Sequence, residues 1–126
     1  MTEYDIIHAD DEVTERKFVE KCAQQSNLSY LGLSCLSALE MALPDNSARI
    51  FVVDGWFPKQ DGDPIRFLAS EAIKCIRSYF PEAKIVLYSS SYEIESIAEE
   101  NMVYFRDKGK FTSRGLVEEL KNILKG

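Results

Sequence analysis

The sequence predicts an α/β fold in which a parallel β-sheet carries helices on both faces. Five short apolar runs alternate with segments whose apolar residues recur at helical spacing. The runs are almost continuously apolar, as is typical of strands that are buried on both faces. Right-handed crossovers place helices on each side of such a sheet, so the predicted class is doubly wound. A chain of 126 residues suits one such domain, residues 1–126, and is too short for two.

The first two strand-and-helix units follow each other closely. Residues 4–9 form a predicted strand that stops at Asp10 and Asp11, and the helix after it has one apolar face made by Phe18, Val19, Cys22 and Ala23. Residues 28–33 form a second, weaker strand. The next predicted helix must end near Pro44, and its apolar positions are Leu36, Leu39, Ala42 and Leu43.

The third unit begins with a predicted strand at residues 49–53, which ends at Asp54. Further along, Asp63 and Pro64 predict the start of a helix, because aspartate caps helices and proline suits the first helical position. We expect this helix to run from Ile65 to Phe80.

The last two units complete the pattern. Residues 84–88 form the fourth predicted strand, and Ser90 to Glu93 has the S-x-x-E form of a capping box, which predicts a short, mostly polar helix. Residues 102–105 form the fifth strand. The final helix has an apolar face made by Leu116, Val117, Leu120, Ile123 and Leu124.

Composition excludes several classes of function. The net charge is −6 and the basic residues are scattered, so we expect no direct binding of nucleic acid. No apolar run is long enough to span a membrane, and the acidic N-terminus has no basic leader, so we expect a cytoplasmic protein without membrane contact. The three cysteines lack C-x-x-C spacing and are expected to be buried free thiols. The single histidine, His8, excludes a site built from several histidines and is expected in the core.

Reactive side chains follow four of the five predicted strands. They are Asp10 and Asp11 after the first, Asp54 after the third, Ser89 and Ser90 after the fourth, and Lys108 after the fifth. In a doubly wound sheet, ligands bind at this carboxyl edge. If the first, third and fourth strands are neighbours, three carboxylates converge and need a counter-ion, for which Mg²⁺ is the expected choice. A carboxylate, Mg²⁺, a lysine and a hydroxyl together suit phosphoryl transfer to the aspartate.

Each of these features alone has an ordinary explanation. Paired aspartates before a helix are usually a solvated turn, a run of serines usually caps a helix, and a lone lysine is usually solvated. Their recurrence in order after successive strands favours one shared site.

Together these residues resemble the receiver domains of bacterial two-component response regulators, including the single-domain chemotaxis receiver. The resemblance covers residues 4–124. It rests on ADDE at 9–12, VVDGWFPKQDG at 52–62 with D-x-x-x-P-x-x-D-G spacing, VLYSSS at 86–91 and FRDKG at 105–109. It implies a five-stranded parallel sheet in the flavodoxin-like order 2-1-3-4-5.

The resemblance also implies roles for individual residues. Asp54 corresponds to the phosphoacceptor, and Asp54 and Asp11 to direct Mg²⁺ ligands, while Asp10 acts largely through metal-bound water. The backbone carbonyl of Trp56 is similar to the remaining protein ligand.

On the phosphate side, Lys108 is similar to the lysine that pairs with the phosphoryl group. Ser89 matches the hydroxyl residue that turns toward that group. Ser90 departs from the pattern, since it replaces a small residue, and it could donate a further hydrogen bond to the phosphoryl group or narrow the approach to it. Phe105 occupies the aromatic switch position.

The resemblance further implies a signalling role rather than that of a classical enzyme. A histidine kinase or phosphotransfer protein would donate the phosphoryl group, with autophosphorylation from small donors and autodephosphorylation. Phosphorylation would switch a surface formed by the fourth helix, fifth strand and fifth helix, with candidate contacts Tyr92, Tyr104 and Phe111. This surface would serve an unidentified downstream protein or output domain, or a homodimer.

Departures from the family pattern at Gly109, Ser90 and Trp56 lead to expectations. Gly109 stands where proline commonly follows the lysine in a cis bond, which leaves the geometry of the Lys108–Gly109 bond open. Trp56 is large for its position, and together with Ser90 it should impede the water that hydrolyses the phosphoaspartate. We therefore expect a long-lived phosphoryl group.

Three alternatives stay open. A phosphatase of the haloacid-dehalogenase type also uses an aspartate and Mg²⁺, but its second acid would stand where Trp56 stands, and the chain has no room for a substrate cap. A receiver-like module that binds partners without phosphorylation is disfavoured by the full set of site residues. A flavodoxin-like cofactor carrier is disfavoured because carboxylates occupy the place of a phosphate-cradling loop.

Overall fold

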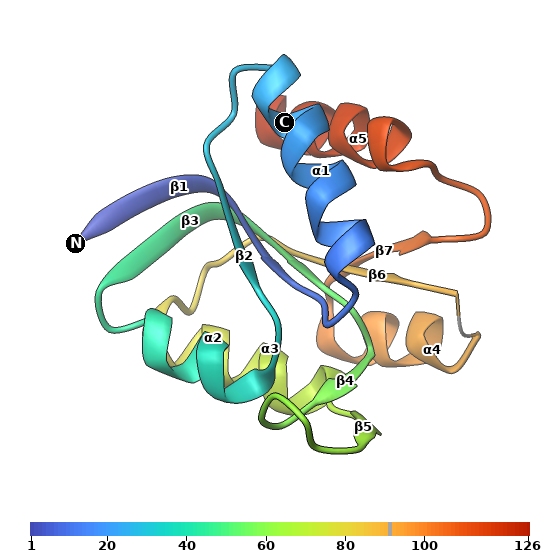
Figure 1. The fold of residues 1–126 in the computed structure, drawn as a ribbon. Coiled ribbons are helices and arrows are strands. Elements are labelled where there is room, and N and C mark those ends of the chain that lie inside the picture. Colours follow the sequence, from blue (N-terminus) through green and yellow to red (C-terminus); the bar gives the residue numbers. More distant parts are fainter. Residues whose placement is uncertain (91) are drawn as a thin grey trace.

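The computed structural model describes residues 1–90 and 92–126, and at Tyr92 the backbone alone. A five-stranded parallel sheet forms its centre (Figure 1). The sheet order is β2-β1-β3-β6-β7, so the predicted order 2-1-3-4-5 is confirmed. These strands are β1 (Thr2–Ala9), β2 (Tyr30–Leu33), β3 (Asn46–Val53), β6 (Ile85–Ser89) and β7 (Tyr104–Asp107).

Helices cover both faces of the sheet, as Figure 1 shows. On one face lie α1 (Val13–Gln25) and α5 (Ser113–Lys125). On the other face lie α2 (Leu36–Ala42), α3 (Ala69–Tyr79) and α4 (Tyr92–Asn101). The doubly wound class is therefore confirmed.

The strands are apolar throughout because alternate side chains enter two different cores. In β3, Phe51 and Val53 pack with α2, α3 and α4, whereas Ile50 and Val52 pack with α1 and α5. This two-residue alternation places every central residue of the strand in apolar surroundings.

Strand and helix ends differ from the prediction where backbone geometry decides them. Residues 102–105 were expected as a strand, but β7 begins at Tyr104. Met102 has a φ of 54° and its N–H donates to the Glu99 carbonyl, so it terminates α4 instead. The predicted capping box before α4 involves Ser91, which lies outside the described residues.

The prediction of a helix from Ile65 was wrong. Ile65–Phe67 forms β5, which pairs antiparallel with β4 (Trp56–Pro58), and α3 begins only at Ala69. The Trp56 and Phe67 rings are in contact, with centroids 5.2 Å apart, while Ile65 is exposed. These residues therefore pair as a hairpin, and Asp63 and Pro64 belong to its connection, whose turn includes Gly62 at a φ of 90°.

The described part of the chain contains no helix that is both long and apolar enough to cross a membrane. Its three cysteines are free thiols, as predicted, but only Cys35 is fully buried. The Cys35 Sγ accepts a hydrogen bond from the Ala38 N–H at the start of α2.

Candidate functional site

Strand register brings the predicted site residues together at the carboxyl edge of the sheet. Ala9 pairs with Val53, so Asp10 and Asp54 leave adjacent strands at the same level. The Asp54 N–H donates to the Ala9 carbonyl at 2.9 Å. On the other side, Ser89 pairs with Asp107, and the Lys108 N–H donates to the Ser89 carbonyl at 3.1 Å.

Lys108 links the two aspartates. Its Nζ lies 2.9 Å from Asp10 Oδ2 and 3.2 Å from Asp54 Oδ2. The Asp10 side chain is completely buried and that of Asp54 is 10% exposed. Burying two carboxylates without a cation would be costly, so the ammonium between them stabilises the arrangement. Lys108 also lies over the Tyr88 ring, 5.6 Å from its centroid.

The surroundings separate the two carboxyl groups in their acidity. At Asp54, burial raises the pKa to about 6, with the nearby Asp10 charge adding to the rise and Lys108 opposing it. At Asp10, burial also favours a higher pKa. Hydrogen bonds from the His8 imidazole and the Glu12 N–H, together with the Lys108 charge, outweigh this effect and lower the pKa to about 2. Burial disfavours the charged form of Lys108, but Asp54 and Asp10 outweigh it and raise the Lys108 pKa. The ammonium therefore persists.

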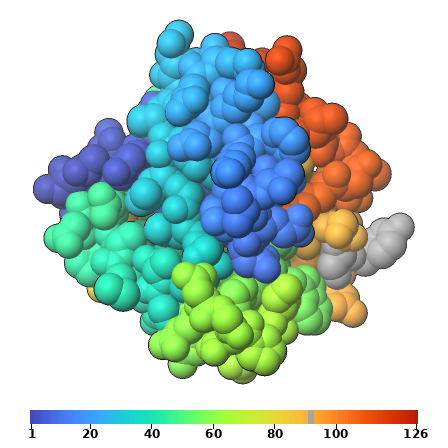
Figure 2. All heavy atoms as spheres, viewed as in Figure 1, coloured from blue at the N-terminus to red at the C-terminus, as the bar shows by residue number. Residues whose placement is uncertain are grey.

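A cavity of about 510 Å³ opens above these groups; we call it the acceptor cavity. Asp54 and Lys108 reach it from the sheet. The residues that line it are Asp11, Glu12, Asp54, Trp56, Ile65, Ser89, Ser90 and Lys108. Figure 2 shows the β4–β5 segment (yellow-green) on the surface beside the start of α1 (blue). Residues from β4 and β5, and from just before α1, line this cavity.

Three carboxylates approach closely enough to share a cation. One oxygen from each of Asp10, Glu12 and Asp54 lies within 4.8 Å of the others. This all-oxygen donor set suits a hard divalent cation such as Mg²⁺. Asp11 was predicted as a ligand; its carboxylate lies outside this group, although Asp11 lines the same cavity.

Sequence reasoning missed Glu12, which immediately follows Asp11 and is the N-cap residue of α1. The Glu12 N–H donates to Asp10 Oδ1 at 2.9 Å. Glu12 lines the cavity, and its carboxylate lies close to those of Asp10 and Asp54. The acidic run Asp10-Asp11-Glu12 was the available signal.

Gly55, the residue after Asp54, is held tightly by α4. A Cβ on Gly55 would lie 2.1 Å from Ile94 Cδ1, and Ile94 is fully buried. Only glycine fits here, so α4 packs directly on the turn that carries Asp54. The Trp56 N–H donates to Asp54 Oδ1 at 3.3 Å, while its side chain is 40% exposed at the cavity rim. The role predicted for its carbonyl stays a prediction.

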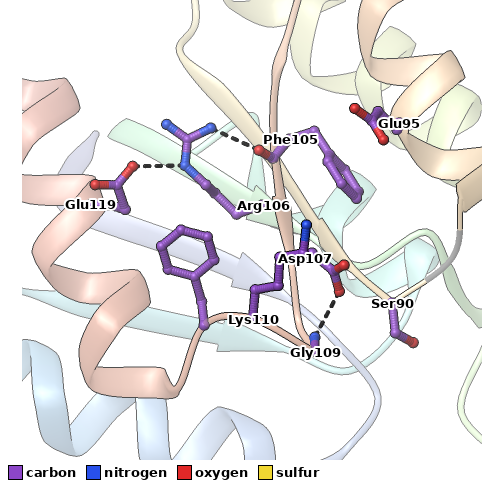
Figure 3. A pocket seen from close by; sticks show the side chains of 9 residues that line it. Ser90, Glu95, Phe105, Arg106, Asp107, Gly109, Lys110 and Glu119 are labelled. Atoms are coloured by element: carbon purple, nitrogen blue, oxygen red, sulfur yellow. Dashed lines mark hydrogen bonds and ion pairs between the residues drawn. The ribbon is translucent and has the colours of Figure 1, made fainter.

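Phe105 lies in a different cavity, of about 640 Å³, between α4, β7 and α5 (Figure 3). Its ring packs against the core cluster that contains Ile94. Arg106 links β7 to α5 at one side of this cavity. Its Nε donates to Glu119 Oε1 at 2.8 Å, and its Nη1 donates to the Phe105 carbonyl oxygen at 2.7 Å. Ser90 lines both cavities, so it stands between the acceptor site and this surface.

Gly109 closes the strand end that carries Lys108. Its N–H donates to Asp107 Oδ1 at 2.7 Å. The Lys108–Gly109 bond is trans, since the described chain contains no cis peptide bond. The sequence left the geometry of this bond open, and in the trans form the lysine still reaches both aspartates.

No family model and no curated protein matches the chain. Solved structures do match it over its whole length. A CheY-like response regulator receiver domain protein from Methanospirillum hungatei superposes with a TM-score of 0.79 at 13% identity, covering 99% of this chain and 94% of that one. The isolated REC domain of RcsB from Salmonella enterica serovar Typhimurium, solved with phosphomimetic BeF3−, gives a TM-score of 0.77 at 22% identity over 99% and 91%.

A third structure, the non-phosphorylated HemR receiver domain from Leptospira biflexa, gives a TM-score of 0.79 at 13% identity and covers 100% of this chain and 96% of that one. The TM-scores show that the fold is shared. At such low sequence identity, the roles of individual residues have to be argued from the geometry of the site. The chain has the fold of response regulator receiver domains.

Proposed function

We propose that residues 1–126 form a single receiver domain that takes up a phosphoryl group on Asp54. The observation that carries this proposal is the Lys108 ammonium held between Asp10 and Asp54 at the carboxyl edge of the sheet. A carboxylate nucleophile, a fixed positive charge and a group of oxygen ligands are the parts that phosphoryl transfer requires. The receiver fold makes a signalling role more plausible than that of a classical enzyme.

In the proposed step, an Asp54 oxygen attacks the phosphorus of a phosphohistidine on a histidine kinase or phosphotransfer protein. The new O–P bond makes an acyl phosphate, while the P–N bond breaks and its electron pair returns to the donor imidazole. A small acyl phosphate reacts in the same way with loss of its carboxylate. Hydrolysis later restores Asp54 and releases inorganic phosphate.

Each side chain at the site has a part in this step. Mg²⁺, held by Asp54, Asp10 and the adjacent Asp11 and Glu12 with the Trp56 carbonyl, would neutralise charge on the phosphoryl oxygens. Lys108 already lies 3.2 Å from Asp54 Oδ2, so a small movement lets it pair with the new phosphoryl oxygens.

We propose that the output surface is formed by α4, β7 and α5. The Ser89 and Ser90 hydroxyls line the acceptor cavity and can donate to a phosphoryl group, and Ser90 also borders the cavity that contains Phe105. Drawing the serines inward would bias Phe105 and α4 toward a second arrangement. Tyr104 and Phe111 are candidate contacts for a downstream protein, an output domain or a second copy of the chain; the side chain of Tyr92 lies outside the described residues.

We also propose a cytoplasmic location, supported by the free cysteines, because thiols persist in a reducing compartment.

Beryllofluoride, a mimic of the aspartyl phosphoryl group, tests this function. The single tryptophan lies at the acceptor cavity, so its fluorescence reports binding there. Titration with Mg²⁺ and beryllofluoride should change Trp56 fluorescence in the native protein and not in Asp54→Asn. No response in the native protein would point to a module that works without phosphorylation. Catalytic turnover of p-nitrophenyl phosphate would point to a phosphatase instead.

A further inference from the structure

His8 lies directly behind the acceptor site. It is in β1, two residues before Asp10, so both side chains leave the same face of the strand. The imidazole is fully buried, with Nδ1 2.8 Å from the Tyr30 hydroxyl oxygen. Its Nε2 is 3.7 Å from Asp10 Oδ2 and has no hydrogen-bond partner among the described residues. A buried polar atom aimed at a carboxylate calls for a physical reason.

The chemistry of the two neighbours assigns the imidazole hydrogen. A carboxylate only accepts, whereas a hydroxyl both donates and accepts. A bare Nε2 lone pair facing Asp10 would be repulsive, so the hydrogen lies on Nε2 and the Tyr30 hydroxyl donates to Nδ1. Burial raises the pKa of Tyr30, so that hydroxyl keeps its proton.

The neighbouring strand is shaped to allow this contact. In the β1–β2 register His8 pairs with Gly32, while Tyr30 pairs with Ile6. Tyr30 must therefore lean along β2 to reach His8. A Cβ on Gly32 would lie 3.0 Å from both the Tyr30 ring and its hydroxyl, so glycine leaves the space that the tyrosine uses. Tyr30 and His8 meet edge to face, with ring centroids 5.8 Å apart.

We propose that His8, held by Tyr30, is a positioning residue that orients the Asp10 carboxylate for the divalent cation. This inference rests on the proposed function, in which Asp10 helps to hold Mg²⁺ and Lys108 moves toward the phosphoryl group. The Glu12 N–H holds the other oxygen, Oδ1. The His8 Nε2 faces Oδ2 from 3.7 Å, and the fully buried imidazole stays in place when Lys108 moves, so it is the donor available to orient that oxygen.

Binding of Mg²⁺ to the unphosphorylated protein, followed by Trp56 fluorescence, tests this proposal. Loss of groups that orient metal ligands typically weakens metal binding by about 10- to 100-fold. We expect roughly that loss for His8→Leu, partial rescue by the amide donor of His8→Gln, and a smaller loss for Tyr30→Phe. The matched control is Tyr79→Phe, which removes a hydroxyl far from the site and should leave Mg²⁺ affinity unchanged.

Nitrogen-15 NMR of the imidazole gives a second readout that does not depend on metal. The native protein should show the hydrogen on Nε2. Hydrogen on Nδ1 alone, or Mg²⁺ affinity unchanged in His8→Leu and Tyr30→Phe, would overturn the proposal even if those variants were less stable. Absence of Mg²⁺ binding by the native protein would instead overturn the proposed function, and this inference with it.

Discussion

The ionised Asp54 carboxylate should destabilise the folded protein at neutral pH. Burial raises the pKa of Asp54 from 3.8 to about 6, so folding favours its protonated form. This favourable contribution to the free energy of unfolding is fully present below about pH 3.8 and is lost as the pH rises through about 6. At pH 7 the carboxylate is charged in both states, and the folded state carries the full penalty.

Asp54→Asn removes this penalty and keeps the shape of the side chain. A pKa change of about 2 corresponds to about 3 kcal/mol, since one pKa unit is about 1.4 kcal/mol. The asparagine can still accept a hydrogen bond from Lys108, which keeps its Asp10 partner at 2.9 Å. We therefore expect Asp54→Asn to be more stable than the native protein at pH 7 by about 1–3 kcal/mol.

Asp10 provides the matched control because its pKa moves the other way. Its lowered pKa of about 2 contributes stability that is present above about pH 3.8 and is lost as the pH falls toward 2. Asp10→Asn should therefore be less stable than the native protein at pH 7.

Urea unfolding without divalent cations, followed by circular dichroism at pH 4, 5, 6 and 7, measures both variants. The advantage of Asp54→Asn should shrink toward pH 4. Equal or lower stability of Asp54→Asn at pH 7, or an advantage that does not change with pH, would refute this reasoning. Adding Mg²⁺ should reduce the stability difference between Asp54→Asn and the native protein, because the cation binds and stabilises the native site.

Three further predictions concern residues around Asp54. Gly55→Ala should lower the free energy of unfolding in urea by about 1–3 kcal/mol, because the added Cβ overlaps Ile94. Adding Ile94→Val should recover part of that loss, and an unchanged stability of Gly55→Ala would contradict the close packing. Trp56→Asn should speed loss of the phosphoryl group by roughly three- to tenfold, a barrier change of about 1 kcal/mol, and an unchanged rate measured by phosphate release would show that the indole does not impede water. Asp11→Asn should weaken Mg²⁺ binding more than Glu12→Gln in a fluorescence titration, because Asp11 is less exposed than Glu12; the reverse order would make Glu12 the stronger ligand.

Much of the fold follows from local sequence because each central strand is apolar and ends in a polar residue. Asp10, Asp54 and Lys108 could be placed together without coordinates, since parallel strands bring their carboxyl ends to one edge. What this reasoning cannot supply is side-chain direction. The ammonium between the two aspartates, and the opposite pKa shifts that result, depend on distances of about 3 Å.

The hairpin shows why the third helix was placed too early. Ile65 and Leu68 fit a helical stripe, while Ile65 and Phe67 fit a strand alternation, and so short a segment does not decide between the two. The decision comes from a distant partner, because Phe67 packs on Trp56 and β5 pairs with β4. The contact between His8 and Tyr30 was likewise out of reach, since it depends on the register of two strands and on Gly32 opposite His8.

Phosphorylation of Asp54 itself is the most direct test of the proposed function. The protein would be incubated with acetyl phosphate and Mg²⁺ and its intact mass measured, with Asp54→Asn and a sample containing EDTA as controls. We predict a gain of about 80 Da, one phosphoryl group, in the native protein alone. No gain in the native protein, or the same gain in Asp54→Asn, would contradict the assignment of Asp54 as the phosphoacceptor.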